Sequence, residues 1–103
     1  MTRASVPRLP IVVVLIVTAL VAIVILDVDT AARAGWRPVE LAAAYFDGGA
    51  RFLQVRAKRA ASGALLDLCD EIVALGSRYE ASVIVNDRPD IARLARAAGA
   101  HLG

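Results

Sequence analysis

The sequence is poor in the residues that build disulfides and zinc sites, and its basic residues form no stripe of the kind that binds nucleic acid. It has one cysteine, one histidine and one lysine among 103 residues. A single cysteine excludes an internal disulfide, and a lone histidine leaves no zinc-ligand spacing. The net charge is only +2, and the basic residues are scattered along the sequence. We therefore expect no nucleic-acid partner. Cys69 falls in an apolar helical pattern and is interpreted as a small core residue, which suits the reducing cytoplasm.

Charged side chains are absent between residues 11 and 26, where Thr18 is the only polar one. Such a run can anchor a chain in a membrane. Its last part belongs to a different pattern, because Ile23 to Asp29 is rich in β-branched residues and ends in acids, as buried parallel strands do. Residues 11–22 would then form a helix of only about 18 Å, short of a hydrocarbon core of about 30 Å. We therefore expect an apolar N-terminal extension over residues 1–22 and a cytoplasmic location, with membrane anchoring through residues 11–26 as the alternative.

From residue 23 onward, strand-like and helix-like segments alternate with short joints, which is typical of βαβ units and a parallel sheet. The predicted strands cover residues 23–29, 52–57 and 82–86, and a fourth begins at residue 100. The helices are predicted from Pro38 to Gly48, from a cap at Ser62, and from a cap at Asp90 to Gly99. Residues 30–37 are expected to form a loop.

The predicted fold class is α/β. Four parallel strands and three helices correspond to half of a (β/α)8 TIM barrel, which needs about 250 residues when complete. Half of a doubly wound sheet would show the same alternation, but its phosphate fingerprint, G-x-G-x-x-G after the first strand, is absent. We expect one domain from residue 23 to residue 103. Such an open half barrel would expose unpaired strand edges and could self-associate.

Two groups of polar residues lie near the ends of predicted strands. Gln54, Arg56 and Lys58 alternate with apolar residues, so they share one face of the second strand. Two cations and an amide suit a phosphate or diphosphate ligand. At the end of the third strand, Asn86 can donate to a phosphate oxygen and Asp87 is a hard oxygen ligand for Mg²⁺. A solvent-facing strand end with paired charges, and ordinary Asn-Asp turn chemistry, remain as the alternatives.

Together these motifs resemble the thiamine-phosphate synthase family. The resemblance rests on GGARFLQVRAK and on VIVNDRPDIARLARAAGAHLG, which contain a Q-x-R-x-K strand, an N-D-R strand end and a G-x-H-x-G segment in order. It implies a transferase that joins hydroxymethylpyrimidine diphosphate to thiazole phosphate, releasing pyrophosphate, with Mg²⁺ as cofactor. By this likeness Gln54, Arg56, Lys58 and Asn86 bind the diphosphate, and Asp87 binds the metal.

The same resemblance implies features that the sequence does not contain. A second metal-binding aspartate is expected just beyond Gly103, and a serine, a lysine and glycine-rich phosphate loops are expected further on. We therefore expect a truncated synthase that is inactive by itself. The alternatives are a related thiazole tautomerase and a non-catalytic, membrane-tethered phosphate-binding module. Asp27 and Asp29 receive no role beyond lining the site, and His101 is interpreted as structural.

Overall fold

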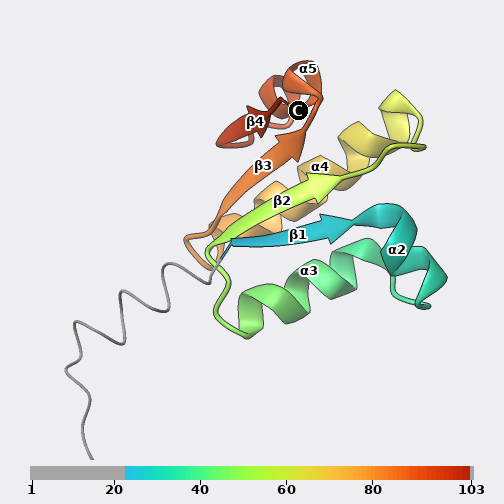
Figure 1. The fold of residues 1–103 in the computed structure, drawn as a ribbon. Helices are drawn as coiled ribbons and strands as arrows, with labels where there is room; N and C mark the ends of the chain where they lie inside the picture. Colours follow the sequence, from blue (N-terminus) through green and yellow to red (C-terminus); the bar gives the residue numbers. More distant parts are fainter. Residues whose placement is uncertain (1–22, 103) are drawn as a thin grey trace, which may run out of the picture.

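The computed structural model describes residues 23–102 of the chain, and these form four parallel strands and four helices. The order along the chain is β1 (Ile23–Asp27), α2 (Val28–Arg33), α3 (Pro38–Asp47), β2 (Phe52–Arg56), α4 (Ser62–Ser77), β3 (Ser82–Asn86), α5 (Pro89–Leu94) and β4 (Gly99–His101). The strands pair in the order β1-β2-β3-β4 (Figure 1). Each crossover between neighbouring strands contains a helix, as a barrel requires.

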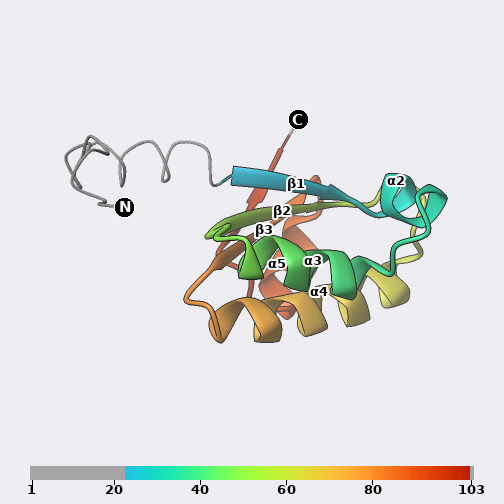
Figure 2. The same ribbon diagram turned by 90° about the horizontal axis from the view of Figure 1, so that it is seen from below.

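The helices cover only one face of the sheet. Figure 2 shows α3, α4 and α5 together on the same side. Successive strand side chains point alternately to the helices and to the opposite face. Five of those on the helix side are buried: Leu26, Leu53, Val55, Val83 and Val85. They meet Phe46, Leu65, Cys69 and Ile72 from the helices in one core. Cys69 is therefore a core residue, as predicted, and burial raises the pKa of its thiol to about 11.

The opposite face of the sheet has no helix over it among the described residues. Ile25 is 55% exposed and Phe52 is 43% exposed there. Gln54 is the register partner of Ile25 on one side and of Ile84 on the other, so these three side chains form a row across this bare face. In a complete barrel this face would be the interior, which is filled by layers of side chains from alternate strands.

The first strand is shorter than predicted, and a fourth helix replaces part of the expected loop. β1 ends at Asp27, and α2 begins at Val28. The reason is a cap: Asp27 Oδ1 accepts a hydrogen bond from the backbone N–H of Thr30 at 3.0 Å, which satisfies a donor that a helix start leaves free. The β-branched Val28 suggested a strand, but this cap and the alanines that follow favour a helix.

The two helix caps predicted from the sequence, at Ser62 and Asp90, are wrong. Ala61, not Ser62, is the N-cap of α4, and Arg88, not Asp90, is the N-cap of α5. Neither helix start has a side-chain cap, because Ser62 and Asp90 lie inside their helices and contact Arg88 instead. α5 also ends at Leu94, earlier than expected, and β4 begins at Gly99.

The predicted extension over residues 1–22, and with it most of the apolar run at residues 11–26, lies outside the described residues. Within residues 23–102, no helix is both long enough and apolar enough to cross a membrane.

Candidate functional site

A pocket of about 350 Å³ opens at the carboxyl ends of β2 and β3. Its walls come from the loop after β2 and from the end of β3: Ala57, Lys58, Ala60, Asn86, Asp87 and Arg88. Three of the predicted site residues, Lys58, Asn86 and Asp87, therefore share one pocket. Lys58 lies beyond the strand, which ends at Arg56, so its place depends on the loop and not on strand alternation.

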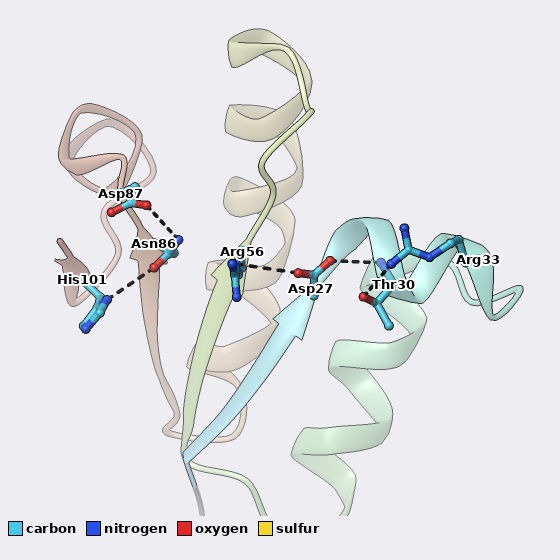
Figure 3. A network of polar contacts seen from close by, with 7 residues as sticks. All are labelled: Asp27, Thr30, Arg33, Arg56, Asn86, Asp87 and His101. Carbon is cyan, nitrogen blue, oxygen red and sulfur yellow. Dashed lines mark hydrogen bonds and ion pairs between the residues drawn. The ribbon is translucent and has the colours of Figure 1, made fainter. Parts of the chain in front are cut away.

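Gln54 and Arg56 lie outside this pocket lining, on the bare face of β2. Arg56 stands between Asn86 on β3 and Asp27 on β1 (Figure 3). Its Nε lies 3.8 Å from Asp27 Oδ2, and its side chain is 39% exposed. Nε itself is buried and makes no hydrogen bond within the described part of the chain. A buried guanidinium donor without a hydrogen bond is costly unless a ligand supplies an acceptor.

Asp27, which the sequence interpretation gave no role beyond lining the site, faces Arg56. It is the register partner of Arg56 across the β1–β2 pair. The hydrogen bond from the Thr30 backbone N–H, with help from the charge of Arg56, lowers the pKa of Asp27 although desolvation opposes this. One oxygen therefore caps α2 while the other faces Arg56. No sequence signal gives the strand register that brings the two side chains together.

Asn86, Asp87 and His101 form a connected group at the end of β3 (Figure 3). Asn86 Nδ2 donates to Asp87 Oδ2 at 3.2 Å, and Asn86 Oδ1 lies 3.3 Å from His101 Nδ1. The Asp87 backbone N–H also donates to the His101 carbonyl at 2.6 Å. Asp87 has φ +59°, a left-handed conformation that Asp and Asn tolerate better than most residues and that often marks functional sites.

Arg88 links the two loops that form the pocket. Its guanidinium donates to Ser62 Oγ at 3.0 Å and to both carboxylate oxygens of Asp90. The hydrogen bonds from Arg88 lower the pKa of Asp90 to about 2. Because Ser62 starts α4 and Arg88 precedes α5, this contact connects the Lys58 loop to the Asn86–Asp87 turn. Arg88 belongs to the N-D-R motif, and the motif itself does not indicate that Ser62 is its partner.

The donor set fits a magnesium ion that is held jointly with a phosphate ligand. Within residues 23–102, no three acidic, histidine or cysteine side chains gather into a metal cluster. Mg²⁺ does not need such a cluster, since it is usually bound by one or two carboxylates together with substrate phosphates and water. Asp87 supplies one carboxylate beside Lys58 in the same pocket.

The fold and the site define a class before any comparison. A parallel sheet with a helix in each crossover, helices on one face and polar side chains at the carboxyl ends of its strands is the arrangement of part of a (β/α)8 barrel. Comparison with known proteins then gives the family. Residues 24–103 match the family model described as thiamine monophosphate synthase, and the chain belongs to this family.

Relatives and a solved structure agree with the family match. The chain is 51% identical over 69 residues to a thiamine-phosphate synthase of Anaeromyxobacter dehalogenans, covering 67% of this chain and 31% of that protein. For a thiamine-phosphate synthase of Methanospirillum hungatei the identity is 39% over 69 residues, covering 67% of this chain and 34% of the relative. The structure of thiamine phosphate pyrophosphorylase from Pyrococcus furiosus is similar, with a TM-score of 0.67 and 26% sequence identity. The match covers 76% of this chain and 37% of the pyrophosphorylase chain.

The predicted family and the partial-barrel fold are thus confirmed. The chain spans about a third of the length of the curated relatives it matches.

Proposed function

We propose that this chain carries the diphosphate-binding part of a thiamine-phosphate synthase. The reaction would join hydroxymethylpyrimidine diphosphate to thiazole phosphate and release pyrophosphate. The observation that carries the proposal is the gathering of Lys58, Asn86 and Asp87 in one pocket, beside Arg56 on the adjacent strand end. The family match supports it, because the relatives are named for this synthesis.

The proposed chemistry places the greatest electrostatic demand on the leaving diphosphate. The carbon–oxygen bond to the pyrimidine methylene breaks, and its electron pair goes to the diphosphate. The thiazole nitrogen then forms the new bond to that carbon. Arg56 and Lys58 would stabilise the growing negative charge, and the amides of Gln54 and Asn86 would donate to its oxygens. Donors fixed before the reaction stabilise charge without a cost of reorganisation.

Arg56 offers a partly exposed guanidinium to such a ligand, although its Nε is buried. Nε makes no hydrogen bond within residues 23–102, and Asp27 at 3.8 Å is an ion-pair partner beyond hydrogen-bond distance. A diphosphate oxygen would contact the exposed part of the guanidinium, and it would reach Nε only if the side chain moved. The charge of Asp27 would remain beside it and hold the guanidinium in place.

Asp87 would hold a magnesium ion together with the diphosphate oxygens. When bound, the ion would supply positive charge to the leaving group. Asn86 donates to Asp87, so the carboxylate has a defined orientation before any ligand arrives. The φ of +59° at Asp87 turns the chain at this point, and Asn is one of the non-glycine residues that tolerate this conformation best.

Binding of inorganic pyrophosphate to the 103-residue chain tests the proposal without requiring turnover. Calorimetric titration in the presence of Mg²⁺ should show binding to the wild type, with weaker binding of orthophosphate. Lys58→Ala should weaken pyrophosphate binding about tenfold to a hundredfold, as expected for one charged hydrogen bond. Arg78→Ala is the matched control, since it removes one positive charge at the opposite end of α4. Equal effects of the two substitutions would contradict a specific site.

We also propose a cytoplasmic location, which the free buried thiol of Cys69 supports.

Self-association is a further proposal, because β1 and β4 each have one unpaired edge within the described sheet. Light scattering should detect dimers or larger species of the purified chain, and a monomer across the concentration range would contradict this.

A further inference from the structure

His101 and Asn86 face each other across the last strand pair of the sheet. They are register partners in the parallel β3–β4 pairing, and His101 Nδ1 lies 3.3 Å from Asn86 Oδ1. His101 is exposed and Asn86 is half-buried. Asn86 forms part of the pocket lining, which does not include His101. The sequence interpretation gave His101 only a structural role.

The neighbouring carboxylate determines which way the Asn86 amide points. Asp87 Oδ2 lies 3.2 Å from Asn86 Nδ2. An ionised carboxylate only accepts hydrogen bonds, so the NH₂ end of the amide must face Asp87. The reversed amide would place two oxygens against each other. The carbonyl end of Asn86 therefore faces His101.

The amide orientation in turn determines where the histidine carries its proton. Asn86 Oδ1 has no hydrogen to donate, so the contact forms only when His101 Nδ1 carries one. In the neutral ring this is the Nδ1–H tautomer, the less common of the two for histidine in water. Bonds at both ends of the planar amide then fix its plane. The bond to Asp87 uses one of the two Nδ2 hydrogens, and the second one acquires a defined direction.

We infer that His101 is a positioning residue that, through Nδ1–H, holds the Asn86 amide ready to donate to the diphosphate. This inference rests on the proposed diphosphate site and adds a residue that acts through Asn86. His101 itself does not touch the ligand. Its loss should leave the Asn86 amide free to rotate, and the ligand would then have to order it. Partners that orient metal ligands typically contribute about tenfold to a hundredfold in affinity or activity, and we expect an effect of the same order here.

A series of substitutions separates this hydrogen bond from a general structural role. Asparagine carries an NH₂ at the position of histidine Nδ1, whereas glutamine carries it at the position of Nε2. His101→Ala and His101→Gln should therefore weaken pyrophosphate binding by about tenfold, and His101→Asn should restore most of it. Thermal unfolding should change little across the series, since the His101 carbonyl that accepts from the Asp87 N–H is unaffected. Unchanged affinity in His101→Ala, or equal losses in all three variants, would overturn the inference.

The tautomer can be measured on the wild-type chain without any ligand. His101 is the only histidine, so a long-range ¹⁵N–¹H correlation spectrum of the neutral ring assigns its tautomer unambiguously. We expect Nδ1–H, with a shift to Nε2–H in Asn86→Ala. A wild-type ring in the Nε2–H form would overturn the inference. If the wild type fails to bind pyrophosphate, the proposed function fails; the Nδ1–H tautomer and its loss in Asn86→Ala would still verify the contact.

Discussion

Asp27 and Arg56 are register partners on adjacent parallel strands, and Asp27 Oδ2 lies 3.8 Å from Arg56 Nε. The second oxygen of the same carboxylate caps α2 through Thr30. One side chain therefore defines where the first strand ends and also faces Arg56, the last residue of β2. Local structure and site geometry are thus coupled at the carboxyl end of β1.

Arg56→Ala should weaken pyrophosphate binding and leave stability nearly unchanged. The loss of one charged donor predicts an affinity about tenfold to a hundredfold lower. The ion pair with Asp27 is partly exposed, so unfolding free energy should change by no more than about 1 kcal/mol. Arg56→Lys keeps the charge but not the planar donor group, so its pyrophosphate affinity should lie between those of the wild type and Arg56→Ala. Normal affinity with a clear loss of stability would assign Arg56 a structural role instead.

Neighbouring substitutions on β2 should separate stability from binding. Leu53 is fully buried against the helices, whereas Gln54 lies on the bare face. Leu53→Ala should destabilise the chain by about 2–5 kcal/mol. Gln54→Ala should change the free energy of unfolding by no more than about 0.5 kcal/mol, but it should weaken pyrophosphate binding. Urea unfolding and calorimetry on the two variants test this, and similar unfolding midpoints would contradict the assignment of the two faces.

The Arg88–Asp90 pair should make stability depend on acid pH. The pKa of Asp90 is lowered from 3.8 to about 2 in the folded chain. Its contribution is therefore fully present above the unfolded value and is lost as pH falls from about 4 towards 2. Asp90→Asn lacks this contribution, so the stability difference between wild type and variant should shrink across that range. Urea titrations at pH 6 and pH 3 measure it, and a constant difference would contradict the pairing.

The sequence predicts those parts of the fold that depend on local pattern. β3 has the predicted bounds, since Ser82 to Asn86 alternates between a buried and a half-buried face. α2 escaped prediction because the cap at Asp27 competes with the β-branched Val28, and only the bond to Thr30 decides between them. Asn86 and Asp87 could be found from their position at a strand end, because parallel strands end at the same edge, whereas Lys58 reaches the same pocket from the loop after β2.

Contacts across strands could not be predicted in the same way. Asp27 meets Arg56, and Asn86 meets His101, only because of the register of two strand pairs. A shift of register by two residues would separate both pairs while keeping every side chain on its own face of the sheet. The same holds for the contact of Arg88 with Ser62, which are 26 positions apart.

The magnesium dependence of pyrophosphate binding tests the central claim most directly. Calorimetry should be run on wild type and Asp87→Asn, each with and without Mg²⁺. Asparagine tolerates the φ of +59°, so the variant removes the charge and keeps the turn. We expect Mg²⁺ to raise wild-type affinity by about tenfold or more, the value of one charge-assisted contact, and to have no effect on the variant. Equal magnesium effects in the two proteins, or no pyrophosphate binding to the wild type, would contradict the account.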